Sequence, residues 1–205
     1  MSLSRLVRTP VGTARVTESR PRAAGGTLVL GHGAGGREWT ADVRDVAAAA
    51  AAAGWRTVLV DQPWRVAGRR VAPAPATLDA AWLPVLAEVC RAASGPLVVG
   101  GRSAGARVAC RTATAVGAAA VLCLSFPLHP PGRPERSRAE ELRLPVAAGL
   151  PVLVLQGARD PFGTPQEVVA AASGPVVTAV PGTHELATLP APALEAVGRL
   201  LSRVG

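Results

Sequence analysis

Lysine and tyrosine are absent from this chain of 205 residues, and aromatic residues make up only 3% of it. All 22 basic residues are therefore arginines, and with 14 acidic residues they give a formal net charge of +8. The arginines are scattered along the chain, and no group of aromatic residues accompanies them. Proteins that recognise nucleic acids usually combine a basic groove with aromatic side chains on which bases stack. The composition therefore argues against specific nucleic-acid recognition and is typical of the codon bias of a GC-rich genome.

Cysteines and long apolar runs are also scarce. Cys90, Cys110 and Cys123 are the only cysteines, and their spacing matches no metal site. Each lies in an apolar segment, which is typical of reduced, buried thiols in a cytoplasmic protein. The N-terminus has no apolar core of a signal peptide, and the alanine-rich run 46–53 is too short to span a bilayer. We therefore expect a cytoplasmic protein without a metal site or a membrane anchor.

The residues that are present indicate a globular α/β domain. Hydrophobic residues make up 49% of the chain and charged residues 18%, which excludes a disordered protein. Apolar runs of strand length alternate with helical patterns, which predicts a mostly parallel central sheet with helices on both faces. We expect one domain, 1–205, in which 1–26 form N-terminal edge strands and 27–205 form the core. The expected core strands are 27–30, 55–60, 96–100, 118–125, 150–157 and 176–180. The main expected helices are 38–53, 76–93 (interrupted by Pro84) and 188–203.

One stretch places a serine where it is reactive. The apolar run 96–100 leads directly into Gly101-Arg102-Ser103-Ala104-Gly105, and a helical pattern follows. A G-x-S-x-G sequence between a strand and a helix forms a sharp turn that exposes the serine hydroxyl as a nucleophile. Glycines two residues to either side of the serine avoid clashes in this turn. A chance match in a glycine-rich chain is the alternative, and the strand-then-helix context favours the nucleophile.

An activated serine also needs a base and a carboxylate that orients the base. Asp160 follows the apolar run 150–157, and His184 follows the predicted strand 176–180. In a parallel sheet these strands end at the same edge as Ser103, and the order Ser, Asp, His is the one that accompanies such a turn. Taken singly, Asp160 is typical of a turn before proline and His184 of a surface residue. The order of the three favours catalytic roles for all of them.

A glycine-rich loop, residues 31–36, follows a buried strand and reads Gly-His-Gly-Ala-Gly-Gly. Such a loop leaves backbone N–H groups free to bind a developing negative charge, and its sequence matches no phosphate-binding motif. We expect two donors to an oxyanion. One is the N–H of Ala104, and the other comes from the loop, where we assign it to Ala34 with Gly33 as the near alternative. His32 precedes the serine in the chain, so we expect it to shape the loop rather than act as the base.

These segments together resemble the α/β-hydrolase superfamily, and within it a small, capless group of predicted hydrolases related to dienelactone hydrolases. The resemblance begins near residue 27, continues to the C-terminus and rests on the segments 31–36, 100–105, 126–134, 156–163 and 182–184. It implies an α/β-hydrolase fold without a cap domain, with Ser103, Asp160 and His184 as the catalytic triad. Relatives often carry an acidic residue or asparagine at the position of Thr183. This difference is expected to hold the histidine loop less firmly, but it removes no member of the triad.

The connection 130–150 lies where larger relatives insert a lid. It is too short for a lid, and its prolines favour an extended path followed by at most one short helix. We therefore expect a shallow, open site. His129, at the end of the preceding strand, is expected either to line the pocket or to make a purely structural hydrogen bond.

Three arginines flank the predicted catalytic loops, namely Arg37, Arg102 and Arg159. A guanidinium group binds carboxylates and phosphates through paired hydrogen bonds, so these side chains are candidates to hold an anionic substrate. Solvated positions at the rim of the site are the alternative for all three.

The sequence thus predicts a serine hydrolase that acts on a small ester-like substrate through an acyl-enzyme, with no metal or organic cofactor. The expected partner is a small molecule, which the arginines allow to be anionic. Two alternatives stay open. The fold could serve as a non-catalytic or weakly active interaction module, since a subunit of a histone acetyltransferase complex is also similar. The same triad could instead cleave a thioester, amide or peptide. The presence of all three triad residues argues against the interaction module.

Overall fold

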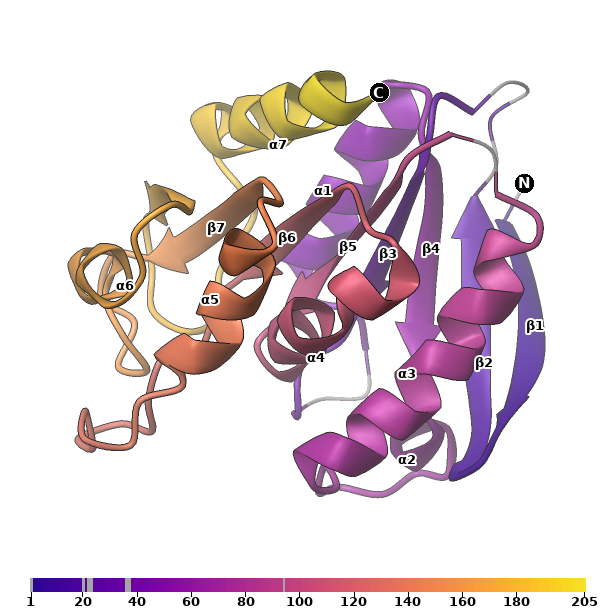
Figure 1. Ribbon diagram of the computed structural model, residues 1–205, viewed down its shortest axis with the longest axis horizontal. Coiled ribbons are helices and arrows are strands. Elements are labelled where there is room, and N and C mark those ends of the chain that lie inside the picture. The colour runs from indigo at the N-terminus through magenta and orange to yellow at the C-terminus, as the bar shows by residue number, and fades with distance from the viewer. Residues whose placement is uncertain (1, 20, 22–23, 36–37, 94) are drawn as a thin grey trace.

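An eight-stranded sheet runs through the molecule in the order β1-β2-β4-β3-β5-β6-β7-β8 (Figure 1). The computed structural model describes residues 2–19, 21, 24–35, 38–93 and 95–205. The strands are β1 (Ser2–Thr9), β2 (Gly12–Ser19), β3 (Thr27–Gly31), β4 (Arg56–Asp61), β5 (Leu97–Arg102), β6 (Ala120–Leu124), β7 (Val152–Gly157) and β8 (Val176–Val180). The pairs β1–β2 and β2–β4 are antiparallel, and the other pairs are parallel. This confirms the predicted mostly parallel sheet, in which β1 lies at one edge and β2 lies between β1 and β4.

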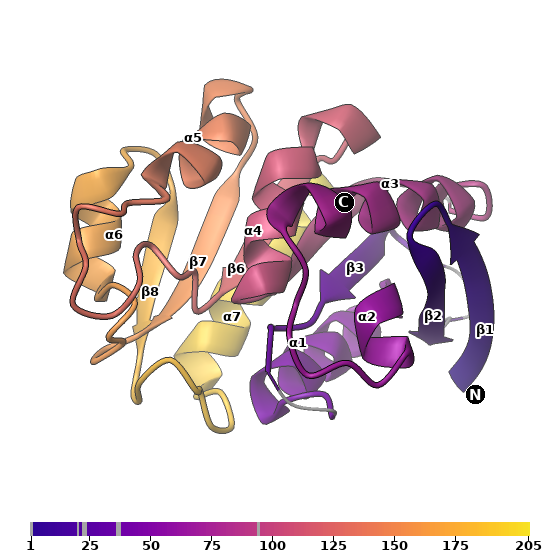
Figure 2. The same cartoon turned by 90° about the horizontal axis from the view of Figure 1, so that it is seen from below.

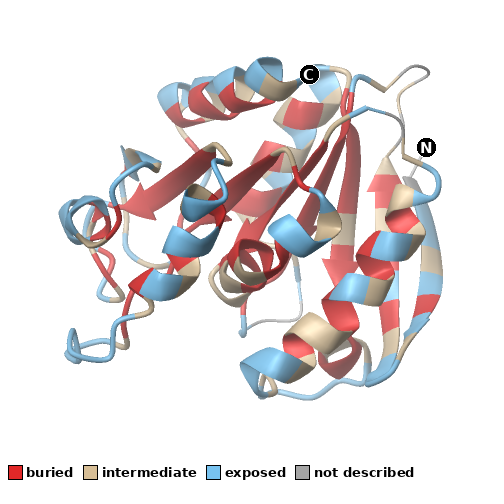
Figure 3. Ribbon diagram, viewed as in Figure 1, coloured by how far each residue is buried: buried red, intermediate tan, exposed pale blue. Residues whose placement is uncertain are grey.

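Helices cover both faces of the sheet (Figure 2). Their bounds are α1 (Ala41–Ala52), α2 (Pro63–Val66), α3 (Pro75–Cys90), α4 (Ala104–Thr112), α5 (Ala139–Ala147), α6 (Pro165–Ala171) and α7 (Ala191–Val204), with a short 3₁₀ helix, η1 (Thr114–Val116). One apolar cluster joins the sheet to α3, α4, α5 and α6, and the other joins it to α1 and α7. Strands covered in this way are buried along their whole length, as β3, β5, β6 and β7 are (Figure 3).

The order of the strands determines where a site can form. The chain passes from β3 outward to β4 and then returns to the other side of β3 to form β5. The connections that leave β3 and β5 therefore depart in opposite directions, and a crevice opens at the carboxyl ends of these two strands. Gly31 and Gly101 are directly paired at this point.

The prediction that Pro84 interrupts the second long helix is wrong. Helix α3 continues through Pro84 from Pro75 to Cys90. Proline removes one hydrogen bond from a helix interior and crowds the preceding turn. Trp82 and Leu86, on either side of Pro84, are fully buried against the sheet, and this packing outweighs the local cost.

The connection after β6 contains only one short helix, α5, as the prolines predicted. Within the described part of the chain, every helix is too short or too polar to cross a lipid bilayer.

Candidate active site

Ser103 lies at the turn between β5 and α4, with a backbone conformation of φ 52° and ψ −108°. Such a conformation is strained for a residue with a side chain and costs on the order of 1–3 kcal/mol. The turn brings α4 so close to β3 that a Cβ on Gly105 would lie 2.5 Å from the carbonyl carbon and oxygen of Gly31. A Cβ on Gly101, whose φ is +155°, would also collide with the Gly31 carbonyl oxygen. Both glycines of the motif are therefore required by the close approach of backbone to backbone.

Three side chains from separate loops form a continuous hydrogen-bonded chain. Asp160 follows β7, and its Oδ2 lies 2.9 Å from Nδ1 of His184, which follows β8. His184 Nε2 lies 2.9 Å from the Oγ of Ser103. Because an ionised carboxylate only accepts, the proton of a neutral imidazole resides on Nδ1, and Nε2 accepts from the serine hydroxyl. The hydroxyl is therefore directed at a nitrogen that can take its proton.

Two residues that the sequence analysis did not identify hold Asp160 and His184 in place. The buried amide of Gln156 donates from Nε2 to Asp160 Oδ2 at 2.9 Å and to the Gly163 carbonyl oxygen at 2.7 Å. The Phe162 N–H donates to Asp160 Oδ1 at 2.8 Å. The Phe162 ring lies 4.2 Å from the His184 ring, centroid to centroid, with 34° between the planes. Asp160 itself is only 1% exposed, so these contacts replace its hydration.

The glycine-rich loop faces the same crevice. His32 is buried, and its Nδ1 donates to the Gly33 carbonyl oxygen at 2.7 Å while its Nε2 accepts from the Gln62 N–H at 3.0 Å. Burial, with a smaller contribution from the charge of Arg65, lowers the pKa of His32 to about 4. The N–H and C=O of a trans peptide point in opposite directions, so a Gly33 carbonyl held by His32 turns the Ala34 N–H away from that ring. His32 thus shapes the loop, as its place in the sequence predicted.

Arg102 turns into the protein. Its Nη2 donates to the backbone oxygen of His184 at 2.8 Å, and its Nε lies 3.4 Å from Oδ2 of Asp42 on α1. Burial raises the pKa of Asp42, and the nearby Arg102 guanidinium opposes that rise. Arg102 borders the pocket in front of Ser103. Its hydrogen bond and its ion pair, however, are made with other groups of the protein.

Two other residues proposed to contact substrate, His129 and Arg159, do not border the pocket in front of Ser103. His129 is buried, with Nδ1 3.0 Å from the Pro130 carbonyl oxygen and Nε2 3.5 Å from Glu167, so its hydrogen bond is of the structural kind. The side chain of Arg159 is exposed and does not border the pocket at Ser103. Arg37 lies outside the described residues.

A pocket of about 340 Å³ opens in front of Ser103. Ala34 and Ala104 border it, so the two expected oxyanion donors lie on its wall. Ala104 is the first residue of α4, and its N–H therefore has no carbonyl partner in a preceding helical turn. The remaining lining residues are Gly35, Arg102, Arg107, Pro127, Arg138, Phe162, His184 and Glu185. A second cavity of similar volume, beside α2, contains none of the three hydrogen-bonded catalytic candidates.

Comparisons with known proteins agree with this architecture. A search of curated proteins found no significant match. An alpha-beta serine hydrolase homologue from Coxiella burnetii superposes with a TM-score of 0.75 at 19% identity, covering 99% of this chain and 97% of that one. An a/b serine hydrolase without lid from Xanthomonas campestris gives 0.72 at 18% identity, covering 98% and 94%. A cold-adapted esterase from an Arctic intertidal metagenomic library gives 0.71 at 18% identity, covering 100% and 94%. The sequence model of a family described as "Alpha/beta hydrolase domain" matches residues 24–189. The chain therefore belongs to the alpha/beta hydrolase family.

Proposed function

We propose that this protein is a serine hydrolase that cleaves a small ester through a covalent acyl-enzyme. The observation that supports this is the hydrogen-bonded chain from Asp160 through His184 to Ser103, in which both contacts measure 2.9 Å. Family membership supports hydrolase chemistry, and one structural neighbour is described as an esterase. A scaffold without activity has no need for this alignment.

The first step forms the acyl-enzyme. His184 Nε2 takes the hydroxyl proton while Ser103 Oγ attacks the ester carbonyl carbon, and Asp160 stabilises the imidazolium that results. The protonated His184 then gives its proton to the leaving alcohol as the bond between the carbonyl carbon and the alcohol oxygen breaks. In the second step His184 takes a proton from a water molecule as the water oxygen attacks the acyl carbon. His184 then returns this proton to Ser103 Oγ as the bond between the acyl carbon and Oγ breaks, which releases the acid and restores the serine.

Each tetrahedral intermediate carries a negative oxygen that needs fixed donors. We assign these to the N–H groups of Ala104 and Ala34, with Gly33 as the near alternative. Ala104 begins α4, so the partial positive charge at that helix terminus also acts on the oxyanion. The hydrogen bond from His32 to the Gly33 carbonyl supports Ala34 as the loop donor, because it fixes the direction of that peptide.

The decisive test is the variant Ser103→Ala with p-nitrophenyl acetate as substrate. We expect turnover to fall by up to about 10⁶-fold, the scale seen when such a nucleophile is removed. Circular dichroism should show that the variant is folded. A fluorophosphonate probe should label the wild-type protein at Ser103 and leave the variant unlabelled. Hydrolysis that survives in the folded variant would reject the proposed function.

The same chemistry applies to thioesters and amides, which differ in their leaving groups. A panel of acetyl esters, thioesters and anilides measured with one protein preparation ranks these classes by kcat/KM. We expect esters to rank above anilides, because an open pocket offers few groups to activate a poor leaving group such as an amine. Lack of probe labelling together with lack of turnover would instead favour an interaction module.

A further inference from the structure

The pocket at Ser103 has an excess of positive charge. Arg102, Arg107 and Arg138 border it, and among the described residues Glu185 is the acidic one on its lining. Only Arg102 was identified from the sequence. An arginine can bind a substrate only if its guanidinium group is not already occupied by other groups of the protein. The contacts of each arginine therefore decide which of them is available to a substrate.

Arg102 and Arg107 already have acidic partners. Arg102 lies against Asp42, as described above. Arg107, on α4, donates to Glu141 on α5 from Nε at 2.7 Å and from Nη2 at 2.6 Å. Glu141 also accepts from Arg111 at 3.0 Å, so one carboxylate is shared between two guanidinium groups.

Arg138 differs from both. Its backbone N–H donates to the Leu128 carbonyl at 2.7 Å and its Nη1 donates to the Pro127 carbonyl at 3.0 Å, which holds the half-buried side chain in place. No ion pair joins Arg138 to a carboxylate in the part of the chain that the structure describes. Burial lowers the pKa of Arg138, and the positive charge of Arg107 lowers it further, against a smaller opposite effect of Glu141. An anion in the pocket would relieve this repulsion.

We propose that Arg138 binds a carboxylate group of the substrate, so that the natural substrate is an ester that carries a carboxylate. This inference rests on the proposed function and specifies its substrate class. A guanidinium has five N–H donors, and the contact with Pro127 uses one of them, which leaves donors for the two oxygens of a carboxylate. The pocket volume of about 340 Å³ accommodates a small molecule that presents both a carbonyl to Ser103 and a carboxylate to Arg138.

The test compares esters that differ only in this charge. For the acyl side, mono-p-nitrophenyl adipate is compared with its neutral carboxamide analogue. For the alcohol side, 3-acetoxybenzoate is compared with 3-acetoxybenzamide. Rates are corrected with the Ser103→Ala variant, which measures uncatalysed hydrolysis. We expect kcat/KM to favour the anionic member of at least one pair by on the order of tenfold to a hundredfold, the range of a charge-assisted hydrogen bond.

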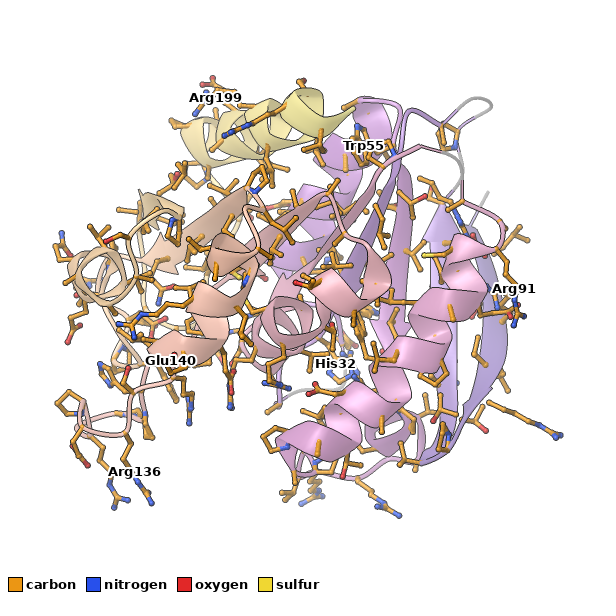
Figure 4. The ribbon with its side chains drawn as sticks, viewed as in Figure 1. His32, Trp55, Arg91, Arg136, Glu140 and Arg199 are labelled. Carbon is orange, nitrogen blue, oxygen red and sulfur yellow. The ribbon has the colours of Figure 1, made fainter. Side chains whose placement is uncertain are left out.

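Variants assign this preference to one side chain. Arg138→Gln should reduce the ratio of anionic to neutral rates to about one, and Arg138→Lys, which keeps the charge without the planar fork, should retain part of it. Arg136→Gln is the matched control, because it removes the same charge from the same connection. The Arg136 side chain projects from an exposed loop away from the sheet (Figure 4). Its replacement should therefore leave the ratio of anionic to neutral rates unchanged. Thermal unfolding verifies that each variant is folded.

Two results would overturn the inference while the proposed function stands. One is a wild-type ratio near one for both pairs, and the other is an anionic preference that persists in Arg138→Gln. If the wild-type protein hydrolyses neither these esters nor p-nitrophenyl acetate, the proposed function fails, and calorimetry with adipate tests the carboxylate site by itself. Binding that is lost in Arg138→Gln and kept in Arg136→Gln would support the site, and lack of binding to the wild-type protein would reject it.

Discussion

Arg102 links the nucleophile to the base, since its Nη2 donates to the backbone carbonyl of His184 over 2.8 Å although the two residues are 82 positions apart. The same guanidinium lies 3.4 Å from Asp42 on α1. One side chain thus joins the end of β5, the loop after β8 and helix α1, which covers the face of the sheet opposite α4. This contact gives the histidine loop an anchor, although Thr183 lacks the acidic or amide side chain that relatives often carry there.

We expect Arg102→Gln to lower kcat about tenfold, equivalent to about 1.4 kcal/mol, with a smaller change in KM. The shorter side chain cannot reach the His184 carbonyl, so the imidazole samples positions away from Ser103. Steady-state kinetics with p-nitrophenyl acetate measure both constants.

The substitution also leaves Asp42 buried without its partner, which is destabilising in itself. The double variant Arg102→Gln, Asp42→Asn removes this effect and should show the same loss of kcat. Arg91→Gln, at an exposed position just after α3, is the control for loss of positive charge. A folded double variant with wild-type kcat would show that the contact does not position His184.

Gln156 is expected to matter for both stability and rate. Replacement by leucine keeps the volume but removes the donor to Asp160 and Gly163, which leaves buried acceptors unsatisfied at a cost of about 1–3 kcal/mol. Asp160 would then be less well fixed, and kcat should fall. Urea unfolding and kcat measured on Gln156→Leu check the two effects, and Gln156→Glu should be more damaging because it places a second carboxylate beside Asp160. Wild-type behaviour of both variants would contradict this role.

His32 makes stability depend on pH. Its pKa is about 4 in the folded protein and 6.5 when unperturbed, so between these values the unfolded chain binds a proton that the folded chain does not. This contribution to stability is complete above pH 6.5 and is lost as the pH falls towards 4. Between about pH 7 and about pH 4.5 we expect a loss of about 2 kcal/mol from this residue.

Urea unfolding of the wild-type protein and of His32→Gln at these two pH values isolates the effect. The carboxylates, including Asp42 with its raised pKa, are common to both proteins, so the difference between their pH dependences reports His32. Glutamine does not titrate, and the variant should lose about 2 kcal/mol less over this range. Equal losses in the two proteins would show that His32 is not held in its neutral form.

Much of the architecture follows from short-range patterns in the sequence. The Val- and Leu-rich runs identify strands that are covered on both faces, and the parallel arrangement then brings their carboxyl ends to one edge. For that reason the order of Ser103, Asp160 and His184 along the chain was sufficient to predict that they meet. The glycine spacing around Ser103 likewise reflects a contact between β5, α4 and β3 that any such turn requires.

The supporting residues follow from tertiary contacts, which sequence patterns do not specify. Gln156 is one polar residue in a buried strand, and only the path of the following loop brings its amide to Asp160. Arg138 reaches the pocket because the connection after β6 folds back, whereas the flanking position of Arg159 suggested a contact that its exposed side chain does not make. Arg107 could have been found, since a residue four positions after Ser103 lies on the same face of the helix.

Two glycines provide a matched test of how closely α4 must approach β3. In Gly105→Ala the new Cβ would lie 2.5 Å from the Gly31 backbone, which cannot move without shifting β3 and the turn at Ser103. We expect a loss of roughly 1–3 kcal/mol in stability and a lower kcat, because overpacking displaces the nucleophile.

In Gly198→Ala, within α7, the new Cβ meets no atom within 4 Å. This change should instead add about 0.5–1 kcal/mol, since alanine favours a helix over glycine. Thermal unfolding should therefore show a lower stability for Gly105→Ala and a higher stability for Gly198→Ala. The kcat should fall in Gly105→Ala and stay unchanged in Gly198→Ala. A Gly105→Ala protein as stable and active as the wild type would mean that the strained conformation of Ser103 does not depend on this contact.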